Sequence, residues 1–171
     1  MIIINTGNGK GKTTAAIGQI VRSLGQGFKV CLIQLFKGEK FYGEQKILMQ
    51  LSNLDFFAFA KEHPCCVKNI SFEKAVEECC LAMDKLKEIV SSTNRYDLII
   101  LEEFNIALRD KFIDEGEFIA LVKCLSQKSD VIITGRSAPQ SLINIANLVT
   151  EMKEIKHQYN EGTRDQKGIE Y

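Results

Sequence analysis

Nine consecutive residues near the amino end have the types and spacing of a phosphate-binding loop. They are Thr6, Gly7, Asn8, Gly9, Lys10, Gly11, Lys12, Thr13 and Thr14. They follow a short apolar run at 2–4 and open an amphipathic helical pattern, which is the context that this motif requires. Glycines let the backbone bring several N–H groups close to phosphate oxygens, and the following helix adds its partially positive N-terminus. Lys12 can then reach the outer phosphates and the Thr13 hydroxyl can bind Mg²⁺, so the sequence predicts a site for a nucleotide triphosphate, with ATP and Mg²⁺ as the expected ligands.

One position of the loop departs from the common motif. The pattern G-x-x-x-x-G-K-T begins with glycine, whereas this chain has Thr6. We interpret the loop as a specialised variant. The alternative, a structural glycine turn with two exposed lysines, does not account for the strand before the loop and the helix after it.

Charged residues follow two further apolar runs. Residues 98–101 read as a buried strand, and Glu102 and Glu103 come directly after it. Either carboxylate could serve Mg²⁺ beside a phosphate loop, and because side chains alternate along a strand we expect only one of them to face the site. The alternative is a solvated strand end or a helix start. Arg136 follows the run 131–134 and offers a cation at the same edge, suited to a phosphate or a carboxylate.

Strand-length apolar runs alternate with helical patterns along most of the chain. We expect strands at 2–4, 28–36, 54–59, 98–101, 131–134 and, more weakly, 148–152. Helices are expected from the phosphate loop to Gly25, from Ser71 to Val90 with Cys79 and Cys80 on the buried face, from Asp114 to Leu125, and after Pro139. Continuous apolar strands indicate an α/β fold with a mostly parallel sheet flanked by helices and with ligands at the carboxyl ends of the strands. Together with the phosphate loop after the first strand, this predicts a fold of the P-loop NTPase-like (RecA-like) type.

Size and charge limit the classes of function. The chain has 171 residues, 45% of them hydrophobic, so we expect one domain spanning 1–171. Lys plus Arg and Asp plus Glu number 22 each, so no net positive charge attracts nucleic acid or a membrane surface. No apolar run is long enough to cross a bilayer, and we expect a cytoplasmic protein. Its six cysteines lack C-x-x-C spacing, and we interpret them as reduced thiols.

With these residues in place, the chain resembles the P-loop ATP:corrinoid adenosyltransferases over essentially its whole length. The resemblance is carried by the phosphate loop and by five further stretches, Gln34-Leu35-Phe36-Lys37-Gly38, Gly43-Glu44, residues 98–103, Ile132-Ile133-Thr134-Gly135-Arg136, and the closing residues from Lys156-His157 to Tyr171. Their order and spacing are similar to those of that family.

The resemblance implies transfer of the 5′-deoxyadenosyl group of ATP to the cobalt of a reduced corrinoid, with triphosphate leaving. It implies that Mg²⁺ lies between Thr13 and the acidic strand end, with Glu103 the closer match, and that Lys12 and Arg136 stabilise the triphosphate. A threonine at position 6 is expected in that family. Cobalt(I) is itself the nucleophile, which agrees with a sequence that shows no convincing pair of nucleophile and base. The family also leads us to expect a homodimer and a flavoprotein as reductant of the corrinoid.

Two stretches leave alternatives open. Family members often set an aromatic pair that includes Trp against the lower face of the corrinoid, but this chain has no Trp and reads Lys61-Glu62-His63-Pro64-Cys65-Cys66 there. His63 or Cys65 could approach the metal, since both types bind transition metals, or could simply pack within a loop. The tail could be a frayed terminus, whereas the resemblance implies an ordered strap near the nucleotide that includes Lys156 and His157.

Two other functions fit the same loop. An ordinary P-loop phosphotransferase or ATPase would orient a hydroxyl or a water toward the γ-phosphate and would release ADP or phosphate instead of triphosphate. A nucleotide-gated carrier would deliver adenosylated corrinoid to a partner enzyme. A GTPase is less favoured, because residues 94–97 only faintly match a guanine motif and precede a strand.

Overall fold

The computed structural model describes residues 1–38, 42–65, 70–156, 162 and 166–169. Within these residues, six strands form one all-parallel sheet in the order β3-β2-β4-β5-β1-β6. The strands are β1 (Ile2–Thr6), β2 (Val30–Leu35), β3 (Leu54–Phe59), β4 (Leu98–Glu102), β5 (Asp130–Thr134) and β6 (Leu148–Glu151). The helices are α1 (Lys12–Gly25), α2 (Gly43–Leu48), α3 (Phe72–Ser91), α4 (Phe104–Arg109), α5 (Glu115–Leu125) and α6 (Gln140–Ile145). The α/β fold expected from the sequence is confirmed.

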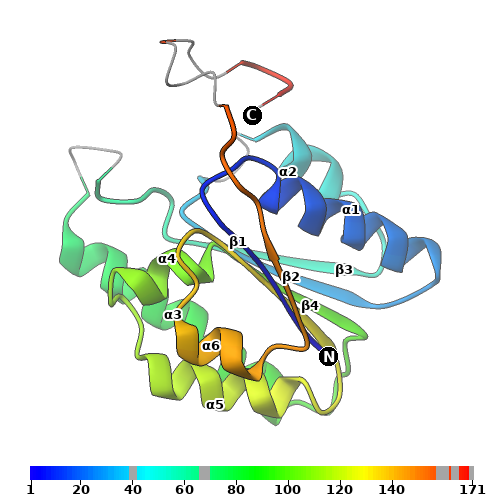
Figure 1. Ribbon diagram of the computed structural model, residues 1–171. Helices are drawn as coiled ribbons and strands as arrows, with labels where there is room; N and C mark the ends of the chain where they lie inside the picture. The colour runs from blue at the N-terminus through cyan, green and yellow to red at the C-terminus, as the bar shows by residue number, and fades with distance from the viewer. Residues whose placement is uncertain (39–41, 66–69, 157–161, 163–165, 170–171) are drawn as a thin grey trace.

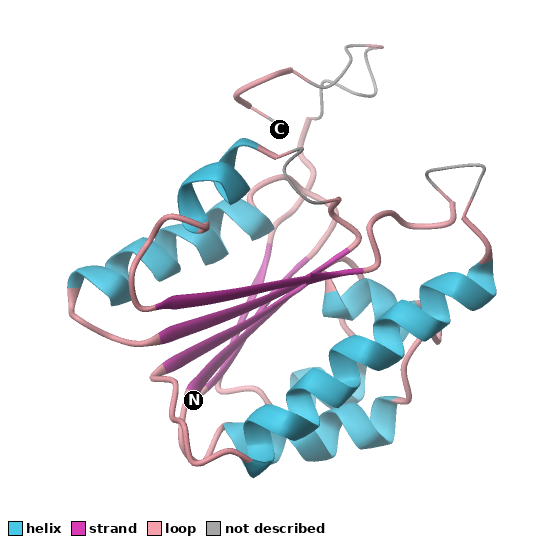
Figure 2. Cartoon of the chain, turned by 180° about the vertical axis from the view of Figure 1, so that it is seen from behind, coloured by secondary structure: helices cyan, strands magenta, loops and turns pink. Residues whose placement is uncertain are grey.

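Helices cover both faces of the sheet (Figures 1 and 2). Helices α1 and α2 lie on one face, and α3, α4, α5 and α6 lie on the other. On the first face, Ala16 and Ile20 of α1 pack with Leu32 and Ile100 of the strands. The larger cluster on the second face includes Leu86, Phe104, Phe118, Ile99 and Ile133. Burial of both faces explains why the central strands are continuously apolar.

Two helix starts follow the local sequence rules. The Ser71 hydroxyl accepts a hydrogen bond from the Lys74 N–H at 3.2 Å, and the Asp114 carboxylate accepts one from the Glu117 N–H at 2.7 Å. These are N-cap interactions, which satisfy backbone donors at the first turn. The prediction for the buried face of α3 was right for Cys79 and wrong for Cys80, which is exposed. Neighbouring residues on a helix point about 100° apart, so one of two adjacent cysteines faces solvent.

Two short helices, α2 and α4, were not predicted. Each has six residues, too few for an apolar repeat to stand out. Strand β2 is also shorter than the predicted run 28–36, because Phe28 is exposed and Phe36 leaves the strand with a φ of 58°. Within the described residues, we find no helix both long and apolar enough to span a bilayer.

Candidate functional site

The phosphate loop connects β1 to α1 and is braced against the chain that follows β6. Gly7 and Gly11 have φ angles of 97° and 115°, which L side chains rarely adopt. A Cβ at Gly7 would lie 2.4 Å from the Met152 carbonyl oxygen, and one at Gly9 would lie 2.6 Å from that of Lys153. The Gly9 N–H donates to the Met152 oxygen at 2.7 Å. Glycine is therefore required here by close backbone approach as well as by φ.

Lys12 lies inside the loop. Its ammonium group donates to the carbonyl oxygens of Gly7 at 2.8 Å and Gly9 at 2.7 Å, and its side chain is buried. Burial lowers the pKa of Lys12, and Arg136 lowers it further, although Glu103 and Glu102 act in the opposite direction. The carbonyl groups of Gly7 and Gly9 thus hold the ammonium within the loop.

Four charged or polar groups meet at the start of α1. The Thr13 hydroxyl donates to Glu102 Oε1 at 2.5 Å, and Lys37 Nζ donates to the same hydroxyl oxygen at 3.1 Å. Lys37 Nζ also lies 3.3 Å from Glu102 Oε1 and 3.7 Å from Glu44 Oε1. Burial lowers the pKa of Lys37, but the neighbouring carboxylates outweigh this effect and raise the pKa overall. The lysine is therefore a cation at neutral pH.

A chain of buried amides supports Glu102. Gln34 Nε2 lies 3.5 Å from Glu102 Oε2, and Gln45 Nε2 donates to Gln34 Oε1 at 2.8 Å. Both amide side chains are buried, and Gln45 Oε1 has no hydrogen-bond partner among the described residues. This chain joins α2 to the carboxylate, so the position of Glu102 depends on a helix that the sequence did not reveal.

The backbone at Glu103 departs from the extended conformation of the strand that precedes it. Strand β4 ends at Glu102, and Glu103 has a left-handed φ of 66° with its N–H donating to Thr134 Oγ1 at 3.0 Å. Strand alternation therefore does not decide where its side chain points. Burial, followed by the charge of Glu102, raises the pKa of Glu103 to about 7. The neighbouring cations, of which Lys37 has the largest effect, lower this pKa in part. Its Oε2 is buried without a hydrogen-bond partner in the described part of the chain.

Thr6 has a structural contact that a glycine could not make. Its hydroxyl accepts a hydrogen bond from the Ala138 N–H at 3.1 Å, and the side chain is buried. Ala138 belongs to the turn between β5 and α6, where Ser137 has a φ of 57°. The first residue of the loop therefore fixes the turn that follows β5, which carries Arg136.

The remaining residues that were predicted to bind the nucleotide or its triphosphate are more exposed. Asn8, Lys10, Thr14, Arg136 and Lys156 all have exposed side chains. Lys10 Nζ donates to the Ile169 carbonyl oxygen at 3.0 Å, so part of the tail returns to the loop. His157 lies outside the described residues. Arg136 acts on Lys12 and Glu103 through its charge, as the pKa directions above indicate.

His63 is held by its neighbours on both ring nitrogens. Nε2 lies 2.8 Å from Asp110 Oδ2, and Nδ1 accepts a hydrogen bond from the Cys65 N–H at 3.2 Å. The ring packs on Phe36 and Phe112, with centroids 5.1 and 5.4 Å away. This arrangement favours loop packing over metal binding for His63, because a ligand needs a free ring nitrogen. Cys65 is exposed, and Cys66 lies outside the described residues.

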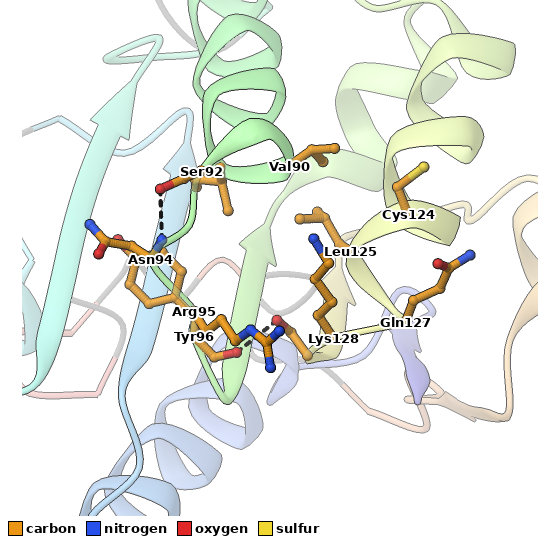
Figure 3. A pocket seen from close by; sticks show the side chains of 11 residues that line it. Val90, Ser92, Asn94, Arg95, Tyr96, Cys124, Leu125, Gln127 and Lys128 are labelled. Atoms are coloured by element: carbon orange, nitrogen blue, oxygen red, sulfur yellow. Dashed lines mark hydrogen bonds between the residues drawn. The ribbon is translucent and has the colours of Figure 1, made fainter.

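Two cavities lie at opposite ends of the sheet. One of about 230 Å³ adjoins the site at the carboxyl end of β3, and it is lined by Lys37, Ala58, Phe59, Ala60, Lys61, Glu78 and Leu81. The other, of about 210 Å³, lies between the ends of α3 and α5 beside Tyr96 and Lys128 (Figure 3). Tyr96 and Ser129 precede β4 and β5, so this second cavity is at the amino edge, away from the phosphate loop.

Sequence reasoning assigned no role to Lys37, Gln34 or Gln45. The first two lie in a stretch that carried the family resemblance, and the usable signal was a glutamine within an apolar strand run followed by a lysine just past its end. Gln45 gave no local signal, because its burial depends on the packing of α2.

Comparison with known proteins identifies the family. A family model described as ATP:corrinoid adenosyltransferase BtuR/CobO/CobP matches residues 1–171. A Sinorhizobium protein named corrinoid adenosyltransferase is 34% identical over 176 residues, covering 100% of this chain and 80% of the relative. A Salmonella typhimurium protein named corrinoid adenosyltransferase CobA is 30% identical over 171 residues, covering 100% of this chain and 85% of the relative. An Escherichia coli protein named corrinoid adenosyltransferase is also 30% identical over 171 residues, covering 100% of this chain and 85% of the relative.

These matches confirm the resemblance seen in the sequence. They extend over the phosphate loop, the acidic end of β4 and the turn after β5, all of which the fold brings to one edge of the sheet. The chain therefore belongs to the ATP:corrinoid adenosyltransferase family.

Proposed function

We propose that this chain transfers the 5′-deoxyadenosyl group of ATP to the cobalt(I) of a reduced corrinoid, with triphosphate as the leaving group, in adenosylcobalamin synthesis or salvage. Family membership supports the reaction. The observation that carries it within the structure is the phosphate loop, in which Lys12 is held by Gly7 and Gly9 while Thr13 is bonded to Glu102.

We expect the triphosphate of ATP to bind on the phosphate loop. The backbone N–H groups at the start of α1 and the ammonium of Lys12 supply the positive potential that polyphosphate requires. Arg136, exposed at the carboxyl edge, adds a cation whose planar guanidinium suits phosphate oxygens. These groups stabilise the charge that develops as triphosphate departs, without any proton transfer.

The residues at the loop fit a magnesium ion. Thr13 offers a hydroxyl oxygen, Glu102 a carboxylate bonded to it, and Glu103 a buried oxygen without a partner among the described residues. Mg²⁺ prefers oxygen ligands and takes only one or two carboxylates when phosphates supply the rest. We assign Thr13 and Glu103 as its protein ligands, with Glu102 orienting the hydroxyl. When bound, the ion neutralises charge on the leaving triphosphate.

Cobalt(I) of the corrinoid substrate supplies the electron pair for the new bond. That pair forms the cobalt–carbon bond at C5′, the C5′–oxygen bond breaks, and its electrons leave with triphosphate. Cobalt is formally oxidised from (I) to (III) in this step. The chain contributes position and exclusion of water, so no side chain has to act as nucleophile or base.

We expect the corrinoid to bind beside the cavity at the carboxyl end of β3. This cavity adjoins Lys37 and continues to Lys61, the start of the stretch in which the family sets its aromatic pair. His63 contributes by packing, with Phe36 and Phe112, and Cys65 remains a candidate for facing the corrinoid because its side chain is exposed.

Three further parts of the proposal concern partners and the tail. We expect the tail that includes Lys156 to lie near the nucleotide, which the contact between Lys10 and Ile169 supports. A homodimer and a flavoprotein reductant are expected from the family. Sedimentation velocity tests the dimer, and coupling to a reduced flavoprotein tests the reductant.

The deciding experiment is product analysis under anaerobic conditions. The protein is mixed with ATP, Mg²⁺ and chemically reduced cobalamin, and the spectrum is followed for a carbon–cobalt bond while phosphorus NMR identifies the polyphosphate. We expect adenosylated corrinoid and triphosphate in equal amounts, and neither from a Lys12→Ala variant. Release of ADP and phosphate without a cobalt–carbon product would identify a phosphotransferase or ATPase instead.

A further inference from the structure

The ammonium group of Lys37 lies beside the hydroxyl of Thr13, which was assigned to magnesium above, and beside Glu102, which orients that hydroxyl. It is 3.1 Å from Thr13 Oγ1, 3.3 Å from Glu102 Oε1 and 3.7 Å from Glu44 Oε1. The side chain is only 13% exposed, and Nζ lies 5.0 Å from the centre of the Tyr42 ring. A hydroxyl and two carboxylates around one cation are oxygen donors of the kind that also bind Mg²⁺.

The charge balance explains why a cation is needed here in the nucleotide-free protein. Glu102 is 1% exposed, and a buried carboxylate without a nearby cation is strongly unfavourable. The Thr13 hydroxyl satisfies one oxygen of Glu102 by donating to it, and Lys37 donates to that hydroxyl and neutralises the carboxylate. The three groups therefore form a closed arrangement that is complete without a metal.

A free dication would have to break this arrangement. It would compete with Lys37 for the Thr13 hydroxyl, and two cations would then share one small buried space beside Glu102. A metal arriving with triphosphate is different, because the complex brings negative oxygens with which the displaced ammonium can pair. The lysine stem is flexible, and it already lines the cavity of about 230 Å³ beside β3, which gives it room to move.

We propose that Lys37 is the resident counter-cation of the magnesium site: it holds Thr13 and Glu102 in the nucleotide-free protein, excludes free Mg²⁺, and yields to the metal only when triphosphate accompanies it. This inference rests on the proposed function for the identity of the site. It assigns Lys37 as a positioning residue that makes metal binding depend on nucleotide.

The test measures metal binding directly and needs neither ATP nor a corrinoid. Mn²⁺, which prefers the same oxygen ligands, is titrated into nucleotide-free protein while electron paramagnetic resonance reports free Mn²⁺. We expect Lys37→Met to bind Mn²⁺ at least roughly tenfold more tightly than the wild type, because the competing cation is gone. Lys37→Arg keeps the charge and should bind as weakly as the wild type. Lys61→Met, which removes an exposed lysine from the same cavity, is the matched control and should also behave as the wild type.

A second arm uses the wild type alone and does not depend on the folding of any variant. Inorganic tripolyphosphate is added at saturation, and we expect it to tighten Mn²⁺ binding to the wild type, once the Mn²⁺ that tripolyphosphate binds without protein is subtracted. Mn²⁺ binding that is equally tight in the wild type with and without tripolyphosphate, or equal in wild type and Lys37→Met, overturns the role of Lys37. Release of ADP in the product analysis above overturns adenosyl transfer instead, so the two failures are distinguishable.

Discussion

The hydroxyl of Thr13 and the carboxylate of Glu102 are joined by a 2.5 Å hydrogen bond, although 89 residues separate them in the chain. The bond connects the first turn of α1 to the end of β4, which lies two strands away from β1 in the sheet. It therefore couples the phosphate loop to the acidic edge of the sheet.

Removing the Thr13 hydroxyl should impair the site more than the fold. In Thr13→Val the bond to Glu102 is lost and the metal loses a proposed ligand, so we expect kcat/KM for ATP to fall by about 10²-fold, the scale of one preorganised polar group. Anaerobic assay of cobalt–carbon bond formation measures this. Thr13→Ser retains the hydroxyl and should keep most of the activity. A loss of activity in Thr13→Ser with activity retained in Thr13→Val would show that the methyl group, and not the hydroxyl, matters.

The two glutamates should differ when each is replaced by glutamine. Glu103→Gln removes the proposed ligand, so we expect the Mg²⁺ concentration for half-maximal activity to rise about tenfold or more. Glu102→Gln leaves Lys37 without its nearest buried carboxylate, so we expect the free energy of unfolding of this variant to fall by roughly 1–3 kcal/mol. Mg²⁺ titration of activity and chemical denaturation of both variants separate these effects. A Glu102→Gln variant with the larger Mg²⁺ requirement would exchange the two assignments.

The protonation of Glu103 should make stability depend on pH. Burial and the charge of Glu102 raise its pKa in the folded chain from the ordinary 4.5 to about 7. The folded state therefore binds this proton more tightly than the unfolded chain, and the resulting stability is present below pH 4.5 and lost as pH rises to about 7. Glutamine does not titrate, so the difference in unfolding free energy between wild type and Glu103→Gln should decline across this window, by up to about 3 kcal/mol.

Denaturant titrations at several pH values, in buffer that contains a metal chelator, measure that difference. A chelator is needed because a bound cation would favour the ionised carboxylate. A difference that stays constant between pH 4.5 and 7, or that grows with pH, would contradict the raised pKa of Glu103.

Local patterns predicted the parts of this molecule that local physics determines. The phosphate loop was recognisable because its glycines, Lys12 and Thr13 lie within one short run, flanked by a strand and a helix. The alternation of apolar runs with helical repeats gave the parallel sheet. The caps at Ser71 and Asp114 were also predictable, since an N-cap acts only three residues along the chain.

The rest depended on distant contacts or on single backbone angles. Because Glu103 has a φ of 66°, its side chain does not continue the alternation of side chains along β4. Nothing in the sequence around this glutamate indicates such a backbone angle. Lys37 acquires its role only because the fold brings Thr13, Glu44 and Glu102 around it. His63 was considered as a metal ligand because its type permits it, but Asp110, 47 residues away, engages its ring. None of these relationships leaves a pattern along the sequence.

Two glycine-to-alanine changes should have opposite effects on stability. A Cβ at Gly9 would lie 2.6 Å from the Lys153 carbonyl oxygen, so Gly9→Ala must shift backbone on one side and should destabilise the fold by about 1–3 kcal/mol. The same shift moves the carbonyl that holds Lys12, so ATP affinity should fall as well.

Gly18 lies on the exposed side of α1, and a Cβ there meets no atom within 4 Å. Gly18→Ala should therefore stabilise the fold by about 0.5–1 kcal/mol, because alanine loses less backbone entropy in a helix. Thermal unfolding with calorimetric titration of ATP tests both variants, and a Gly9→Ala protein as stable as the wild type would show that the loop does not need its contact with the chain after β6.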